Sequence, residues 1–114
     1  MCSKARLNKI VDEVSRDVRD ALGDRLKSVI LYGSYARGDF DDESDIDFMV
    51  LADNAGEKMP EFRNALCGIS SDISLENNVT VSILLKDGKF FYDHARVLPF
   101  YQNVVSEGVT VYER

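Results

Sequence analysis

The chain has 114 residues, a net charge of −6 at pH 7 and a hydrophobic content of 45%. A chain of this length supports one domain with an ordinary core, so we expect residues 1–114 to form a single domain. The acidic balance excludes a protein that binds nucleic acid backbones directly, because such binding depends chiefly on clustered Lys and Arg. No apolar run approaches the roughly 18 residues of a membrane span, and no secretory leader is evident, so we expect a cytoplasmic protein that does not contact membranes.

Residues 3–23 are predicted to form an amphipathic helix, because apolar residues recur there at intervals of three and four. Ser3 is the candidate N-cap, and Gly23 is the candidate C′ residue that ends the helix. The charged residues of the outer face are interpreted as a solvated surface. We therefore expect this segment to be scaffold.

Two short runs of strand character, residues 27–32 and 45–51, enclose the most informative stretch of the sequence. The first run ends at Gly33, which allows the backbone to approach a ligand closely. Ser34 offers a hydroxyl and an N–H at the start of a short helical turn, a usual place for phosphate oxygens. The guanidinium group of Arg37 is a candidate to bind the same phosphates through two N–H groups. The turn is therefore predicted to hold a polyphosphate.

Acidic and apolar residues alternate in the second run. A strand places Asp45 and Asp47 on one face and directs Ile46 and Phe48 into the core. Two strand rises of about 3.3 Å separate the Cα atoms of the two aspartates by about 6.6 Å. Carboxylates that reach out from there can share ions about 3.5–4 Å apart, the separation found in two-metal phosphoryl-transfer sites. The pair therefore predicts Mg²⁺ ligands, with ordinary exposed charges on a strand as the alternative.

The acidic loop between the turn and the second strand matches neither of two known loop types. A calcium loop needs Gly where Ser44 stands and Glu where Val50 stands. A P-loop needs Lys and then Ser or Thr where the sequence has Asp39-Phe40. We interpret the remaining acids as a solvated loop: Asp39, Asp41, Asp42 and Glu43.

The later elements are predicted from periodicity and from breaker residues. They are a helix over residues 57–74 that Pro60 interrupts or starts, a strand over 79–85, a helical stretch over 90–106 with a break before Pro99, and an edge strand over 109–112. The second helical stretch offers an apolar face made of Phe91, Ala95, Leu98, Tyr101, Val104 and Val105. Phe62 is expected in the core, and His94 is interpreted as a surface or hydrogen-bonded helix residue. The fold class is mixed α/β (α+β): a small mixed sheet of four strands, packed on one side by helices, with the strand order left open.

The spacing of the turn and the acids resembles a known family. Gly33-Ser34, ten residues, and then Asp45-Ile46-Asp47 resemble the G-S-x10-D-x-D signature of the DNA polymerase β-like nucleotidyltransferase superfamily. Ala36-Arg37-Gly38 is similar to the corresponding segment of its minimal nucleotidyltransferase (MNT) group, and residues 98–114 are similar to the C-terminal ends of these short proteins. The signature is specific because two strands, a fixed gap and three residue types must agree.

The resemblance implies a polymerase β-like nucleotidyltransferase core with two Mg²⁺ ions as cofactors and ATP as substrate. Asp45 and Asp47 would be the catalytic and metal-binding residues. Gly33, Ser34 and Arg37 would bind the nucleotide.

One part of the family pattern is missing. Catalytically complete members take a third acidic residue from a later strand, where it binds the catalytic metal and activates the nucleophile. Here the strand over 79–85 shows Thr80 and Ser82 on one face and no carboxylate, while Glu76 and Asp87 flank its ends. A general base contributes typically 10²–10⁴-fold, so transfer could be slow or absent even where MgATP binds.

Three functional hypotheses remain. The first is a Mg²⁺-dependent nucleotidyltransferase that moves NMP, chiefly AMP from ATP, to a hydroxyl. The resemblance implies a tyrosine of a partner HEPN-domain toxin as acceptor, an antitoxin role and a hetero-oligomer with that partner. The second is a catalytically degenerate module that neutralises the toxin by contact alone. The third, the weakest, is adenylylation of a small molecule such as an aminoglycoside.

Overall fold

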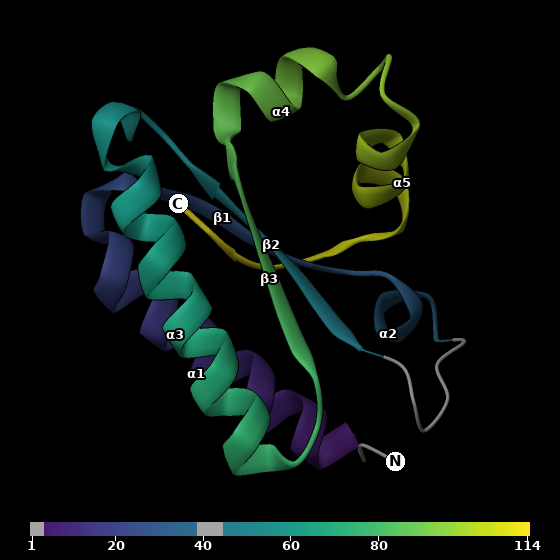
Figure 1. Ribbon diagram of the computed structural model, residues 1–114. Helices are drawn as coiled ribbons and strands as arrows, with labels where there is room; N and C mark the ends of the chain where they lie inside the picture. The colour runs from purple at the N-terminus through teal and green to yellow at the C-terminus, as the bar shows by residue number, and fades with distance from the viewer. Residues whose placement is uncertain (1–3, 39–44) are drawn as a thin grey trace.

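The computed structural model describes residues 4–38 and 45–114, and Figure 1 traces the chain. Its helices are α1 (Lys4–Leu22), α2 (Ser34–Arg37), α3 (Met59–Asn77), α4 (Gly88–His94) and α5 (Pro99–Glu107), with the short 3-10 turns η1 (Gly23–Arg25) and η2 (Gly56–Lys58). Its strands are β1 (Leu26–Tyr32), β2 (Ile46–Ala52), β3 (Val81–Asp87) and β4 (Val109–Glu113). The predicted N-cap Ser3 and the acidic loop over residues 39–44 lie outside the described residues.

The predicted helices and strands are present, and their largest boundary shifts occur around α3. Pro60 lies in the first turn of this helix and therefore starts it rather than interrupts it. The helix continues to Asn77 and ends at Asn78, whose backbone is left-handed with φ of 53°. Because this cap and the following loop need residues 78–80, β3 begins at Val81, two residues later than predicted.

The sheet is mixed, with the strand order β3-β2-β1-β4. β1 pairs antiparallel with both β2 and β4, and β2 pairs parallel with β3. A parallel pair needs a long crossover connection, which α3 provides here. β2 and β1 are therefore the central strands, and β3 and β4 form the two edges.

One face of the sheet carries the larger core. β2 contributes Ile46, Phe48 and Val50, each 0% exposed, which confirms the predicted inward direction of Ile46 and Phe48. The helices α1 and α3 cover this face (Figure 1). They contribute Ile10, Val14, Val18 and Leu22 from α1, and Phe62, Leu66 and Ile73 from α3. The four-residue spacing on α1 places its contacts on one stripe of the helix.

The opposite face carries a second, smaller core beneath α4 and α5. It consists of Ile30, Met49, Leu51, Phe91, Tyr101 and Val104. The prediction that helices pack on one side only is therefore wrong. The reason lies in β2, where residues 48–52 are all 0% exposed, so apolar side chains leave the strand on both faces and each face needs a cover. An uninterrupted apolar run of this kind is typical of a strand buried on both sides.

The apolar face predicted for the last helical stretch is only partly buried. Leu98 is 37% exposed and Val105 is 56% exposed, because the chain turns between α4 and α5 and presents these side chains outward. Phe62 is buried as predicted. His94 is a hydrogen-bonded helix residue, with Nδ1 2.9 Å from the carbonyl oxygen of Phe90.

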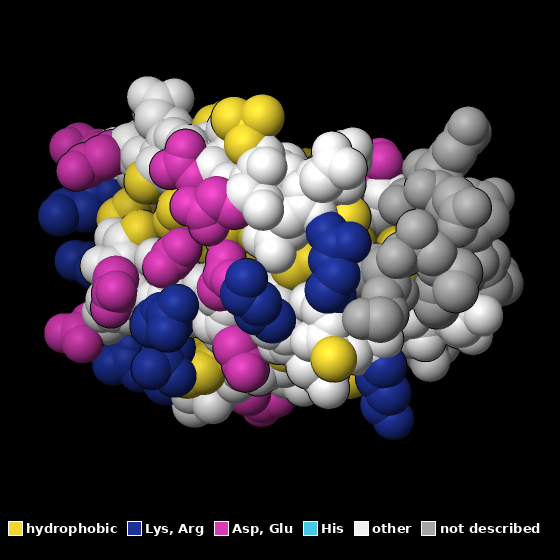
Figure 2. All heavy atoms as spheres, turned by 90° about the horizontal axis from the view of Figure 1, so that it is seen from below, with side chains coloured by type: hydrophobic (Ala, Val, Ile, Leu, Met, Phe, Trp, Pro, Cys, Tyr) yellow, Lys and Arg dark blue, Asp and Glu magenta, His cyan; other side chains and the backbone are white. Residues whose placement is uncertain are grey.

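The outer surface near α1 carries mixed charges. Lys9 and Glu13 form an i, i+4 ion pair at 3.6 Å. On the face seen from below, Lys and Arg side chains alternate with Asp and Glu side chains (Figure 2). Within residues 4–38 and 45–114, none of the helices combines the length and the apolar character needed to cross a lipid bilayer.

Phe48→Ala should lower the free energy of unfolding by about 3–5 kcal/mol, because it leaves a cavity between the sheet and the α1–α3 layer. Urea denaturation followed by circular dichroism measures this change. Val97→Ala is the control, since Val97 is 68% exposed and its truncation should change stability by less than about 0.5 kcal/mol. Similar stabilities of the two variants would contradict the core assignment.

Candidate functional site

The candidate site lies where the start of β2 meets the end of β1. Asp47 is on the face of β2 that α4 and α5 cover, and the sheet register places Tyr32 of β1 and Ser82 of β3 on either side of it. Residues directly opposite each other in paired strands present their side chains to the same face. Asp45 directly precedes β2, is exposed, and by strand alternation belongs to the same face as Asp47. The structure thus brings both predicted aspartates to one open end of the sheet.

The turn after β1 lies against the Asp47 carboxylate. A Cβ atom at Gly33 would be only 2.6 Å from Asp47 Oδ2. Gly33 also has φ of 79° and ψ of −157°, a conformation that residues with a Cβ rarely adopt. Its carbonyl oxygen accepts hydrogen bonds from the N–H groups of Ala36 and Arg37, at 3.1 and 3.0 Å. Glycine is therefore needed here both for the backbone turn and for the close approach to Asp47.

The short helix α2 begins at Ser34, as predicted, and ends at Arg37. Both predicted phosphate-binding side chains therefore lie within one turn of the chain, next to Gly33. The turn ends at Gly38, which has φ of 85°. The three residues predicted to bind the nucleotide thus form one unit beside Asp47.

The folded structure disfavours the charge of Asp47. Burial, and then the charge of Asp45, raise the pKa of Asp47 above its ordinary value, while Arg37 lowers it. Burial, and then the Asp47 carboxylate, raise the pKa of Tyr32 to about 12. Both shifts are signs of negative charge held in a partly desolvated place, and a cation bound there would oppose both.

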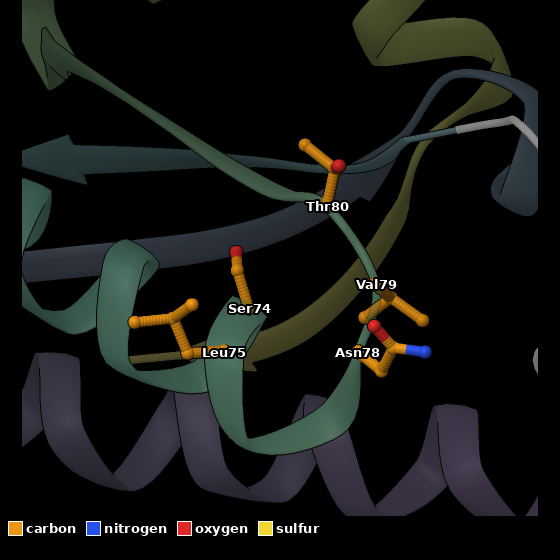
Figure 3. A pocket seen from close by; sticks show the side chains of 5 residues that line it. All are labelled: Ser74, Leu75, Asn78, Val79 and Thr80. Carbon is orange, nitrogen blue, oxygen red and sulfur yellow. The ribbon is translucent and has the colours of Figure 1, made fainter.

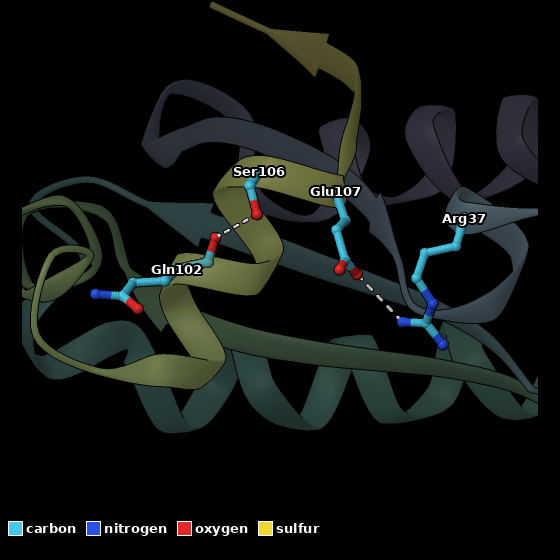
Figure 4. A network of polar contacts seen from close by, with 4 residues as sticks. All are labelled: Arg37, Gln102, Ser106 and Glu107. Atoms are coloured by element: carbon cyan, nitrogen blue, oxygen red, sulfur yellow. Dashed lines mark hydrogen bonds and ion pairs between the residues drawn. The ribbon is translucent and has the colours of Figure 1, made fainter.

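Arg37 connects the turn to α5. Its Nη1 lies 3.3 Å from Glu107 Oε2 (Figure 4). A cavity of about 150 Å³ lies beside this ion pair, lined by Tyr32, Gly33, Arg37, Phe100, Asn103, Val104 and Glu107. The rings of Tyr32 and Phe100 meet edge to face, with their centroids 5.6 Å apart. The turn over residues 33–38, which is predicted to bind phosphates and is called the phosphate turn below, therefore lies on the same side of Asp47 as the end of α5.

The structure locates the two acids that flank β3. Asp87 lies at the far end of the strand, paired with Ala52, and its Oδ2 accepts a hydrogen bond from the Phe90 N–H at 2.9 Å as the N-cap of α4. Glu76 lies on α3, the helix that covers the other face of the sheet. Among the described residues, no three His, Cys, Asp or Glu side chains are grouped so that they could hold a metal ion. Within the part of the chain that the structure describes, neither acid that flanks β3 therefore joins Asp45 and Asp47 in a group that could hold a metal ion.

The residues present fit a hard divalent cation. Two carboxylates supply the oxygen ligands that Mg²⁺ prefers, and Mg²⁺ commonly binds through one or two carboxylates together with substrate phosphates. The missing Cβ at Gly33 leaves room at Asp47 Oδ2. Asp45 and Asp47 therefore remain the predicted metal ligands, and Ser34 and Arg37 remain the predicted phosphate-binding residues beside them.

Sequence reasoning missed two neighbours of the site. Tyr32 could have been found, because it precedes Gly33 at the end of a predicted strand. Glu107 offered no local signal, since it is 70 residues from its partner Arg37 and only the packing of α5 brings them together.

Comparison with known proteins identifies relatives along nearly the whole chain. The model of the nucleotidyltransferase domain family matches residues 7–109. MJ0141 of Methanocaldococcus jannaschii, a protein adenylyltransferase candidate, is 37% identical over 79 residues, which are 68% of this chain and 76% of that protein. MJ0604 of the same organism, also a protein adenylyltransferase candidate, is 29% identical over 104 residues, 91% of this chain and 96% of that protein.

Solved structures share the fold at low sequence identity. A nucleotidyltransferase candidate from Sulfolobus solfataricus superposes with a TM-score of 0.61 at 22% identity, covering 96% of this chain and 83% of that chain. A toxin–antitoxin structure with AMP-PNP superposes with a TM-score of 0.60 at 22% identity, covering 91% of this chain and 73% of that chain. The mixed α/β fold class predicted from the sequence is therefore confirmed.

Gly33→Ala should disturb the site more than Gly38→Ala does. Both glycines have positive φ, so alanine strains the backbone at each: about 1–2 kcal/mol at Gly38, which is left-handed, and about 1–3 kcal/mol at Gly33, whose ψ is −157°. Only at Gly33 would the new methyl group also collide with Asp47, whereas nothing lies within 4 Å at Gly38. We expect Mn²⁺ affinity, measured by electron paramagnetic resonance, to fall at least about tenfold in Gly33→Ala and to change little in Gly38→Ala. Equal losses in the two variants would contradict the contact with Asp47.

Asp47→Asn should stabilise the metal-free fold at neutral pH. The folded state raises the pKa of Asp47, so its charged form costs stability above that pKa, and the cost disappears as the pH falls and the carboxyl takes up a proton. We expect a gain of less than about 1 kcal/mol, because solvent screens this half-exposed group. Thermal unfolding at several pH values measures it, with exposed Asp12→Asn as control. In excess Mg²⁺ the order should reverse, because binding stabilises only the wild type.

Proposed function

Because the chain belongs to the nucleotidyltransferase domain family, we propose that it acts as a member of the minimal nucleotidyltransferase group and transfers AMP from ATP to a hydroxyl group of a partner protein. The observation that carries the proposal is the contact between the Gly33 turn and the Asp47 carboxylate. This contact brings the turn that is predicted to bind phosphates next to a predicted metal ligand. Asp45 completes the pair on the same face.

In the proposed complex, the turn binds the outer phosphates of ATP. Ser34 donates its hydroxyl, and Arg37 exchanges part of its contact with Glu107 for phosphate oxygens. Asp45 and Asp47 would hold Mg²⁺ beside the α-phosphate. When bound there, Mg²⁺ would supply positive charge that offsets the triphosphate and the two carboxylates.

The transfer step is an in-line displacement. The acceptor oxygen forms a bond to the α-phosphorus, the bond from that phosphorus to the bridging oxygen breaks, and pyrophosphate leaves. The proton of the acceptor passes to water, since the described residues place no further carboxylate beside Asp47. Little covalent chemistry is required of the protein, so positioning and charge carry the catalysis.

A tyrosine is the acceptor that best suits this site. A phenol has a pKa near 10, far below that of an aliphatic hydroxyl, so it loses its proton more readily without a protein base. The curated relatives are protein adenylyltransferase candidates, and one fold neighbour is a toxin–antitoxin structure with an ATP analogue. These observations support a protein acceptor and an antitoxin role in a hetero-oligomer with that partner. The acceptor that we propose is a tyrosine of a HEPN-domain toxin.

A second candidate function rests on the missing third acid. The described residues group no third His, Cys, Asp or Glu with Asp45 and Asp47. In this second function the chain binds the partner toxin and neutralises it by contact, without transfer. Both functions predict a partner protein, but only the first predicts a covalently bound AMP. Adenylylation of a small molecule such as an aminoglycoside is less favoured, because residues 4–38 and 45–114 are taken up by the core fold and contribute no added substrate unit.

Asp47→Asn should abolish Mg²⁺-dependent ATP binding while the fold is kept. Calorimetric titration of ATP with Mg²⁺ into wild type, Asp47→Asn and the exposed control Asp72→Asn measures this, and only Asp47→Asn should lose the signal. Incubation with α-labelled ATP and a co-encoded HEPN protein then separates the two functions. Label on a partner tyrosine supports transfer, whereas complex formation without label supports the binding module. ATP binding by Asp47→Asn at wild-type affinity would contradict the site.

A further inference from the structure

We propose that the acceptor is an extended polypeptide segment that docks at the β3 edge of the sheet, in the pocket between the end of α3 and the start of β3. The pocket has a volume of about 360 Å³ and is lined by Ser74, Leu75, Asn78, Val79 and Thr80 (Figure 3). This inference rests on the proposed function and adds the surface on which the acceptor docks and the side from which it approaches.

The order of the strands sets the side of approach. The phosphate turn follows β1, and the ion pair between Arg37 and Glu107 places the end of α5 on that side too. Pyrophosphate therefore leaves on the β1 side of Asp47. Because the attacking and leaving oxygens lie roughly in line across the α-phosphorus, the acceptor must come from the opposite side. That side is β3, the edge strand beside β2.

The start of β3 leaves room for an incoming hydroxyl. Ser82 is opposite Asp47 in the register, and the Thr80 carbonyl oxygen accepts a hydrogen bond from the Ile46 N–H at 2.9 Å. Neighbouring strands lie about 4.8 Å apart, so both small side chains stand beside the aspartates. Both are exposed. A tyrosine of the acceptor can therefore pass over Thr80 and Ser82 to reach the α-phosphate.

The pocket has walls that hydrogen bonds hold together, and part of its rim is apolar. Ser74 accepts a hydrogen bond from the Val81 N–H at 2.9 Å, and the Ser70 hydroxyl bonds to the Val81 carbonyl oxygen, so α3 and β3 are tied together beneath it. Leu75 is 83% exposed, which is unusual for a large apolar side chain. Figure 3 shows Thr80 pointing away from α3. An apolar side chain of the acceptor fits against Leu75. The backbone and polar groups of the acceptor then face the side chains of Ser74, Asn78 and Thr80.

A second exposed apolar surface, on α5, lies on the wrong side for attack. Phe100 and Val105, 43% and 56% exposed, belong to α5, the helix that reaches Arg37. A hydroxyl brought in from α5 would meet the leaving pyrophosphate rather than the face of the phosphorus opposite it. The bond changes remain those of the proposed reaction, with the phenol oxygen bonded to the α-phosphorus, pyrophosphate released and the phenol proton passed to water.

The test uses a short acetylated and amidated peptide with one tyrosine between leucine and lysine residues. The ¹⁵N-labelled protein is titrated with this peptide in the presence of MgATP analogue, and amide shifts should gather at residues 74–82. Separately, adenylylation of the peptide and hydrolysis of ATP to AMP are measured together. Leu75→Asp should lower the ratio of peptide adenylylation to hydrolysis roughly tenfold, from the loss of one apolar contact. Val105→Asp, a matched change on α5, should keep the wild-type ratio.

The outcomes separate this inference from the function on which it rests. Shifts that gather on α5, or a fall in the ratio for Val105→Asp alone, would overturn the β3 approach. Wild type that hydrolyses ATP but neither binds nor modifies the peptide would overturn the polypeptide acceptor and leave nucleotidyl transfer intact. Wild type that neither binds nor hydrolyses ATP would overturn the proposed function itself.

Discussion

The position of Asp47 depends on the burial of β2 on both faces. It is the only ionisable residue among the seven of the strand, and the residues that follow from Phe48 to Ala52 are fully buried. A slip of the register by one residue would move every side chain to the other face, which would push the carboxylate under α1 and α3. Packing on both faces of β2 therefore fixes the position of the Asp47 carboxylate. Substitutions along this strand should be poorly tolerated. The site is held in place by packing, while its chemistry comes from a strand end where packing stops.

Fixing a carboxylate there lowers the stability of the metal-free protein. The Gly33 turn approaches Asp47 so closely that no larger residue fits, and Asp45 adds a like charge that raises the pKa of Asp47 further. Neither feature improves the fold. Functional sites commonly break local rules in this way and are compensated elsewhere. The compensation is the large α1–α3 core on the far side of the same strand, so one element carries both the largest apolar contribution and the least favourable charge.

Much of the fold could be predicted from the sequence because its signals are local. Alternation placed Asp45 and Asp47 on one face and Ile46 in the core, and the glycine turn located α2. The two-sided packing was missed although the apolar run from Phe48 onward indicates it. The strand order, the ion pair of Arg37 with α5 and the pocket at the start of β3 had no local signal. Each joins segments that are distant in sequence, and only the folded arrangement brings them together.

Ser82 is connected with two properties of the site: the lack of a carboxylate on β3 beside Asp47, and the open edge of β3. A carboxylate at this position would stand next to Asp47, where it could share a metal ion and accept the proton of the acceptor. A serine cannot act as that general base, but its small side chain leaves the β3 edge open beside the aspartates. The loss matters least for an acceptor that ionises readily, and the opening matters most for one that is bulky. A tyrosine within a polypeptide has both properties, whereas an aliphatic hydroxyl ionises far less readily. With no third ligand grouped with Asp45 and Asp47 among the described residues, a protein phenol is the acceptor that best suits the proposed transfer.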